Sequence, residues 1–558
     1  MPKLRLALLV LLVLGSFGLR VWGITFGLPF AYHPDEQQYI LPGLGVVSGH
    51  FEPIAYYNPT LYPYFIGLIY TLTYLGLHLF GAFPDFFDLN SGWSQSMQPW
   101  IAGLIFLARY LTVAVGVVTT LVVYQLGRRA YSRPTGLAAA IIFGLAFLPA
   151  RETHFAVSDA PTALGVAVTL YLVLKIVRRG HWSDYVWVGV ALGLSAATKY
   201  TAALLIVPVG VAHLVSRRYP TWPQRLLQGW RGILTGLAAV ASYLLASPYT
   251  LLAWPEFWAD FSENLQSAKA GFQGLNLDPA GGAIFYLKGL VWGFGWPLVG
   301  LFLLAIIFLL WRHKRVDLVL LSLPLFGFWY MQRQEMYFVR WLMPFLPPLA
   351  VVAAETLHAA ARKVGQVADW SGPGTNQRFA LRRPAALTIM LALLLTLPST
   401  YMALQADRVF SRLDTRTEAL QWIQAHVPPG SRIAAEVLSP PWGPPLAMPG
   451  LNIGPYQFAP VPDGGIAEVD PQQYRDWGVQ YIVASSFHYA RQLRDQDHQA
   501  KLASNLQTLD QEAELVAVFQ PYAADYPGFF YHDQVYGPAN DVLYRRQPGP
   551  EIRIYRWP

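Results

Sequence analysis

The stretch AGLIFLARYLTVAVGVVTTLVVYQLGRR, residues 102–129, decides the fold class of this chain. Its apolar part is long enough to cross a bilayer core of about 30 Å as a helix, and it ends in the basic pair Arg128 and Arg129. Apolar runs of this kind recur from the N-terminus to about residue 402. The sequence therefore predicts an α-helical polytopic membrane protein.

The composition agrees with this fold class. Of the 558 residues, 54% are hydrophobic and 13% are charged, whereas an ordinary soluble domain has roughly 25% charged residues. The net charge of +7 comes from short Lys and Arg clusters between apolar runs. Such clusters are typical of cytoplasmic loops, so no nucleic acid is expected as a partner. The chain has no cysteine, which excludes disulfides and thiolate chemistry.

The basic clusters predict how the chain threads the bilayer. If each cluster is cytoplasmic, an even number of crossings must join each one to the next. This rule gives about eleven transmembrane helices in the plasma (inner) membrane, with a cytoplasmic N-terminus and an extracytoplasmic C-terminus. The expected spans are about 1–24, 102–126, 135–150 and 160–174, two within 185–216, two between Arg231 and Arg312, two between Arg315 and Arg362, and 384–402.

Two domains are expected. Residues 1–402 form a transmembrane domain, in which 25–100 is a first external loop with interfacial helices. The apolar segment Leu61–Phe83 is interpreted as interfacial or re-entrant, because a single crossing there would invert every later basic cluster. Residues 403–558 form a small extracytoplasmic α/β domain, with a helix that starts at the capping-box sequence Thr415–Glu418. Its expected strands are Arg432–Val437, Val479–Ala484, Glu514–Phe519 and Ile552–Tyr555.

The predicted external loops carry acidic and histidine side chains. Asp35 and Glu36 follow the first span, and adjacent carboxylates in such a loop can act as a general base or hold a divalent cation. The alternative is a solvated loop with two ordinary acids. In the second external loop, an N-cap role would by itself explain Asp159. The candidates for an acceptor or metal site are His33, Glu152, His154 and Asp159.

Several basic residues fall on the external side, where they are disfavoured. The predicted topology puts Lys199 and Arg340 at two separate external turns, with Arg20, Arg109 and Arg333 on the same side. Cations from separate spans suit an anionic group held at the membrane boundary. The alternative is that each side chain reaches outer-leaflet headgroups. We predict that Lys199 and Arg340 converge on one phosphate.

An ordered series of short stretches carries a family resemblance: Gly27–Pro29, His33–Glu36, Asn58–Pro63, Leu126–Arg129, Arg151–Pro161, Ala197–Thr201 and Tyr337–Pro344. In this order they resemble the polyprenyl-phosphate-sugar-dependent GT-C glycosyltransferases, the superfamily of protein O-mannosyltransferases and lipid A aminoarabinose transferases. The likeness covers about residues 1–402. It departs at Asn58-Pro59-Thr60, where many relatives have a second proline.

The resemblance implies a membrane glycosyltransferase that moves a sugar, with inversion, from a polyprenyl-phosphate-linked donor to an acceptor hydroxyl on the non-cytoplasmic side. The acceptor would be a glycolipid, a polysaccharide or a protein. Asp35 would be the base or the acceptor-orienting carboxylate, and Glu36 its partner. A divalent cation serves some branches of the superfamily, so no cofactor is fixed. The donor phosphate would be bound by Lys199 and Arg340, with Tyr200 and Tyr337 beside them.

Other classes of protein stay open from the residues alone. A transporter would suit eleven spans, although transporters place their sites near the bilayer midplane and the polar groups here fall in predicted loops. A non-enzymatic envelope assembly protein with an external sensor domain is the second alternative. A ligase for a preassembled glycan would differ from the implied enzyme in its donor.

Overall fold

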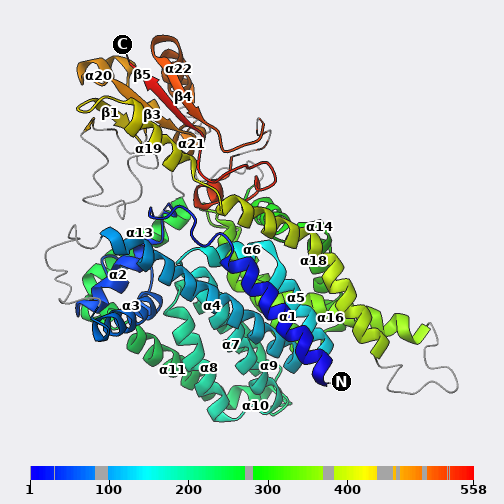
Figure 1. Cartoon of the computed structure of the whole chain (residues 1–558). Helices are drawn as coiled ribbons and strands as arrows, with labels where there is room; N and C mark the ends of the chain where they lie inside the picture. Colours follow the sequence, from blue (N-terminus) through cyan, green and yellow to red (C-terminus); the bar gives the residue numbers. More distant parts are fainter. Residues whose placement is uncertain are drawn as a thin grey trace.

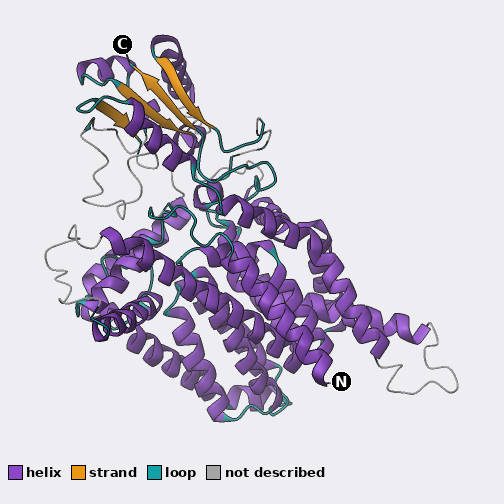
Figure 2. Cartoon of the chain, in the orientation of Figure 1, coloured by secondary structure: helices purple, strands orange, loops and turns teal. Residues whose placement is uncertain are grey.

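A computed structural model gives the fold as a helical bundle with a small α/β unit at one end (Figures 1 and 2). The N-terminus lies at the end of the bundle that is far from this unit, and the C-terminus lies within the unit. The described residues are 2–30, 32–81, 98–270, 281–367, 382–436, 456–459, 461, 465–492, 499–524, 526, 528 and 530–557.

Helices occupy every segment at which the sequence predicts a span. Six of them are long and apolar enough to cross a membrane, by length and composition, and a seventh crossing results if α5 and the bent helices after it form one span. The helices α8, α9 and α15 have 15, 9 and 17 residues, fewer than the roughly 20 that one crossing needs. The count of eleven therefore stays a prediction. The main bundle helices are α1 (Pro2–Val21), α4 (Gln98–Ala130), α5 (Arg133–Leu145), α6 (Phe147–Arg151), α7 (Asp159–Arg178), α8 (Trp182–Ala196), α9 (Ile206–Leu214), α11 (Trp230–Ala246), α14 (Gly281–Arg312), α15 (Arg315–Met331), α16 (Leu346–Val367) and α18 (Arg382–Phe410).

Small residues let α5 pack deep in the bundle. Ala138, Ala139 and Ala140 are fully buried, and α5 contacts α4, α16 and α18. A Cβ on Gly136 would lie 2.4 Å from the carbonyl oxygen of Tyr124, so the backbones of α4 and α5 touch at this glycine. Close approach at small residues is the usual way in which membrane helices associate.

The predicted first external loop contains two packed helices, α2 (Gln37–Val47) and α3 (Leu61–Leu79). A Cβ on Gly67 would lie 2.5 Å from the Cβ of Val46, so glycine permits their close contact. Helix α3 is not among the six helices that are long and apolar enough for a crossing, and its interpretation as an interfacial segment stays a prediction. The later part of the predicted loop, residues 82–97, lies outside the described residues.

The C-terminal unit is built on a five-stranded sheet of order β2-β1-β3-β5-β4. The inner strand β1 pairs in parallel with β2 and β3, and β5 runs antiparallel to β3 and β4. All four predicted strands are present, although Val437 lies outside the described residues, and the two-residue strand β2 is additional. The strands are β1 (Arg432–Ala435), β2 (Gln457–Phe458), β3 (Tyr481–Ser485), β4 (Glu514–Phe519) and β5 (Ile552–Arg556).

Helices cover both faces of this sheet because its strands bury side chains on each. On one face Ile482 packs with residues of α20 (Pro471–Asp476) and α22 (Gln499–Glu512); on the other, Val483 packs with α19 (Thr415–His426). The short helix α21 (Ser486–Gln492) follows β3. The predicted capping box is wrong by one residue, since Asp414 accepts the cap hydrogen bond from the amide of Arg416. Helix α18 runs unbroken to Phe410, beyond the predicted boundary at 402.

Candidate active site

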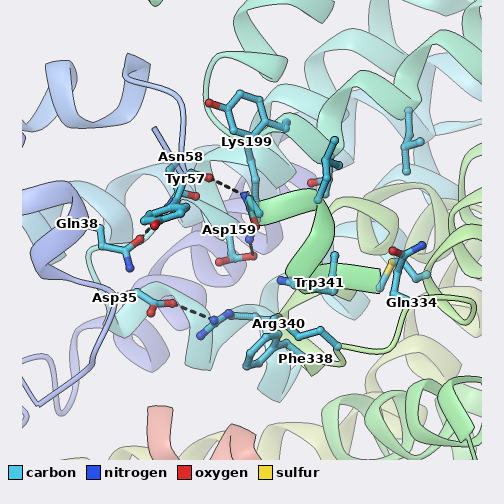
Figure 3. Close-up of a pocket in the computed structure, with 18 of the residues that line it drawn as sticks. Asp35, Gln38, Tyr57, Asn58, Asp159, Lys199, Gln334, Phe338, Arg340 and Trp341 are labelled. Atoms are coloured by element: carbon cyan, nitrogen blue, oxygen red, sulfur yellow. Dashed lines mark hydrogen bonds and ion pairs between the residues drawn. The ribbon is translucent and has the colours of Figure 1, made fainter. Parts of the chain in front are cut away.

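A cavity of about 590 Å³ lies where the predicted external loops meet the C-terminal unit. Two carboxylates and two cations line it together, Asp35 and Asp159 with Lys199 and Arg340 (Figure 3). They come from the turn before α2, the first residue of α7, the end of α8 and the 3-10 helix η5 (Val339–Phe345). The structure therefore brings together, in one cavity, four residues that lie far apart in the sequence.

Asp35 and Arg340 form one ion pair in this cavity. The Nη2 of Arg340 lies 2.9 Å from the Oδ2 of Asp35, and the two side chains are 9% and 24% exposed. The guanidinium carbon is 4.5 Å from the ring centre of Phe338 and 3.9 Å from that of Tyr536. Within the described residues, the Nη1 of Arg340 makes no hydrogen bond. This nitrogen is itself buried, so Arg340 faces Asp35 through Nη2.

Lys199 and Asp159 form the second ion pair, with 2.6 Å between Nζ and Oδ1. Lys199 adopts an extended backbone between α8 and the 3-10 helix η4 (Tyr200–Leu205). Asp159 begins α7, where the helix dipole favours a negative charge. Its expected N-cap role is wrong, because Ser158 occupies the cap position and no side-chain cap bond is made there. The ammonium group of Lys199 has three donors, so the pair leaves donors available.

Glu36 lies away from this cavity, so the predicted partnership with Asp35 is not formed. Its carboxylate accepts two hydrogen bonds of 2.7 Å from Arg109, and both side chains are fully buried. Arg109 also donates to the carbonyls of Ile24 and Phe26. The physical reason is that successive side chains in a turn leave the backbone in different directions. Glu36 and Arg109 join the loop to α4.

His33 is buried beside the cavity and outside its lining. Its Nδ1 accepts a hydrogen bond of 3.2 Å from the amide of Asp35, and its ring lies against those of Phe155 and Tyr536, at 4.4 and 5.1 Å. Burial, together with the positive charge of Arg340, lowers the pKa of His33 well below its usual value. A neutral His33 therefore shapes the loop that presents Asp35.

The other two loop candidates are also buried in structural contacts. The Nε2 of His154 lies 2.9 Å from the carbonyl of Trp22 and 3.3 Å from Asp407. Glu152 is paired with the adjacent Arg151. Within the described part of the chain, no three His, Asp or Glu side chains form a group that could hold a metal ion. Of the candidates His33, Glu152, His154 and Asp159, only Asp159 lines the cavity, so the described residues do not join the four into one metal site, and an acceptor role for them stays a prediction.

Some of the predicted tyrosines and external cations line the cavity, and the others lie outside it. Tyr200 lines the cavity, and its hydroxyl donates to the carbonyl of Tyr56 over 2.9 Å. Tyr337 instead packs against Phe285, outside the lining. Arg20 is buried between α1 and α5 through the carbonyls of Ser16 and Gly144, and Arg333 lies over Trp329. Of the predicted external cations, Lys199 and Arg340 are thus the two that reach the cavity.

The sequence missed two parts of the cavity wall. Gln38 and Asn58 are joined by a hydrogen bond of 2.9 Å, and both line the cavity beside Asp35. The stretch FYHDQVYGPAND, residues 530–541, returns from the C-terminal unit and adds His532 and Tyr536 to the lining. Its aromatic content was a signal for burial, but no local pattern indicates where such a segment packs.

Known proteins resemble the chain both in sequence and in fold. The family model of dolichyl-phosphate-mannose-protein mannosyltransferases matches residues 94–247. No curated protein sequence matches the chain significantly.

Solved structures extend the comparison to almost the whole chain. The apo oligosaccharyltransferase of Archaeoglobus fulgidus has a TM-score of 0.53 and 13% identity, over 89% of this chain and 72% of that one. The same organism's oligosaccharyltransferase AglB, in complex with an inhibitory peptide and a dolichol-phosphate, has a TM-score of 0.50 and 13% identity, over 93% and 73%. Apo ArnT of Cupriavidus metallidurans has a TM-score of 0.50 and 14% identity, over 98% and 97%.

The family match over residues 94–247 and the fold shared with these solved structures support the resemblance to the GT-C glycosyltransferases. This agrees with the resemblance drawn from the ordered stretches. The matching family and the similar solved structures are transferases, which favours an enzyme over the transporter and assembly-protein alternatives.

Proposed function

We propose that this protein transfers a sugar from a polyprenyl-phosphate-linked donor to an acceptor hydroxyl, in the inner membrane and on its non-cytoplasmic side. The observation that carries the proposal is one cavity lined by a carboxylate, Asp35, and by the two cations Lys199 and Arg340. The similar fold of AglB, which was solved in complex with a dolichol-phosphate, supports the class of donor. The acceptor would be a glycolipid, a polysaccharide or a protein.

The chemistry of the transfer needs these side chains. A glycosyl phosphate already has a good leaving group, so the enzyme must orient or deprotonate the acceptor hydroxyl and stabilise the departing phosphate. Asp35 would accept the proton or a hydrogen bond from the hydroxyl. Attack by the acceptor oxygen on the face opposite the phosphate forms the new glycosidic bond and inverts the sugar carbon.

The departing phosphate would bind between Arg340 and Lys199. The carboxylates and cations of the cavity sum to zero formal charge, so the phosphate would not face a net negative lining. The remaining donors of the Lys199 ammonium group would bind phosphate oxygens, and the charge of Arg340 would stabilise the phosphate beside them. Charge-assisted hydrogen bonds of this kind are the strong ones.

Replacement of Asp35 tests the proposal. The purified full chain is incubated with polyprenyl-phosphate hexoses and membrane extract, and the products are identified by mass spectrometry. Asp35→Asn should lower the transfer rate by about 100-fold or more, since general-base catalysis contributes roughly 10²–10⁴-fold. The matched control is Asp476→Asn, at an exposed position in the C-terminal unit. Asp35→Asn activity within about threefold of wild type would remove Asp35 from the proposed role.

A further inference from the structure

Residues 530–541, here called the returning segment, bind to the transmembrane part of the chain through Arg151. The Nε of Arg151 donates to the carbonyl of Pro538 over 2.7 Å, and its Nη2 donates to the carbonyls of Asp533 and Gly537 over 2.9 and 3.3 Å. Arg151 is 3% exposed. A buried guanidinium that binds three carbonyls of one segment fixes that segment closely.

The backbone of the returning segment fits this position. Gly537 has a φ of 122°, in the region that favours glycine. A Cβ there would lie 3.1 Å from ring carbons of both Phe155 and Phe410. Glycine therefore lets the segment approach the loop after α6 and the end of α18.

The same segment holds Arg340 at two points. The carboxylate of Asp533 accepts a hydrogen bond of 2.9 Å from the amide of Val339, the residue before Arg340. The ring centre of Tyr536 lies 3.9 Å from the guanidinium carbon of Arg340, whereas the ring centre of Phe338 lies 4.5 Å from the same carbon. One contact fixes the backbone and the other fixes the guanidinium.

We propose that the returning segment completes the active site by positioning Arg340, and that Tyr536 is the positioning residue for its guanidinium. The ring face of Tyr536 holds the guanidinium so that Nη2 bonds Asp35 and the charge lies at the cavity where the donor phosphate would bind. A cation over an aromatic face in a dry site is stabilised by the ring quadrupole. The inference rests on the proposed function, because it concerns how the phosphate-binding cation is held.

The alternative is that the segment only packs the C-terminal unit onto the bundle. In that case any large apolar side chain at position 536 would preserve the packing. The effect of a Tyr536 substitution on donor binding would then be the same with and without Arg340. The ring-to-cation distance of 3.9 Å favours a direct effect on Arg340, and a binding measurement separates the two.

The experiment measures the Kd of a polyprenyl monophosphate for the purified full chain in detergent. Tyr536→Leu should weaken binding by about 3- to 30-fold, whereas Tyr536→Phe, which keeps the ring face, should bind as wild type. The matched control is Tyr531→Leu in the same segment, because the ring of Tyr531 packs 4.6 Å from that of Trp292. In an Arg340→Gln background, Tyr536→Leu should have no further effect. Thermal unfolding of each variant verifies that it is folded.

Several outcomes would overturn the inference. A folded Tyr536→Leu protein that binds the polyprenyl monophosphate with the wild-type Kd would do so. Equal weakening of this binding by Tyr531→Leu would also do so. A third such outcome is a further loss of binding when Tyr536→Leu is added to Arg340→Gln. Weakened binding by Tyr536→Phe would assign the effect to the hydroxyl instead of the ring. If the wild-type chain binds no polyprenyl monophosphate, the proposed function fails together with the inference, whereas normal wild-type binding with an unaffected Tyr536→Leu protein removes the inference alone.

Discussion

The carboxylates of Asp35 and Glu36, adjacent in sequence, lie in separate environments. Asp35 is 24% exposed at the cavity and pairs with Arg340, whereas Glu36 is fully buried and pairs with Arg109. The partners differ as much as the exposure, since Arg340 has an unused donor and Arg109 also binds two loop carbonyls. One acid therefore lies at the cavity and the other in the buried interior.

This difference predicts opposite phenotypes for the two acids. Glu36→Ala leaves Arg109 buried without its counter-charge, and breaking a buried pair in this way costs about 3–5 kcal/mol of folding free energy. The variant should show a much lower thermal unfolding temperature and yield. Asp35→Asn, at a part-exposed site, serves as the control and should unfold near the wild-type temperature while losing activity. A Glu36→Ala protein of wild-type stability would contradict the structural role.

Lys199 and Asp159 form an ion pair, but their substitutions should have different effects on the donor KM. Lys199→Met removes a cation and leaves Asp159 uncompensated at the cavity, so the donor KM should rise by about tenfold or more, as a lost charged hydrogen bond predicts. Asp159→Asn removes a negative charge beside the proposed phosphate position, so the donor KM should stay at or below that of wild type. Donor kinetics of both variants test this. Unchanged kinetics in Lys199→Met, or equal losses in both, would disprove it.

The burial of His33 predicts that acid destabilises the fold. Burial and Arg340 lower the pKa of His33 well below 6.5, while the unfolded chain protonates it near pH 6.5. Below that pH the folded state binds fewer protons, so the free energy of unfolding falls as the pH falls, by at most about 1.4 kcal/mol per pH unit for one group.

Unfolding temperatures at roughly pH 7.5 and pH 5 measure this effect. His33→Phe should reduce the difference between the two, because the group that takes up the proton on unfolding is gone. The control is His426→Gln, at an exposed position in α19, which should keep the wild-type difference. An identical pH dependence in His33→Phe and wild type would refute the assignment.

Topology can be tested directly. The parity of the basic clusters predicts that residues 403–558 lie outside and the segment before α18 inside. Reporter fusions after Arg383, at the start of α18 (Arg382–Phe410), and after Arg412, just beyond its end, should report opposite sides of the membrane. If both reporters lie on the same side of the membrane, the predicted topology with an odd number of crossings and a cytoplasmic N-terminus is wrong.

The sequence determined much of the architecture because its signals are local. Long apolar runs fix where membrane helices form, and alternating short runs predicted four of the five strands of the C-terminal unit. The ordered stretches of the loops indicated the superfamily. They also pointed to Asp35, Lys199 and Arg340, which line one cavity, with roles that stay predictions.

Tertiary structure decided which of the candidate side chains share the cavity. Asp35 faces it while Glu36 pairs with Arg109 in the interior, because the turn before α2 sends neighbouring side chains in different directions. Residues 530–541 reach Arg340 through contacts that join positions hundreds of residues apart. Hydropathy and helical periodicity carry no information on such pairings, since these depend on how distant segments pack and on which buried charge finds which partner.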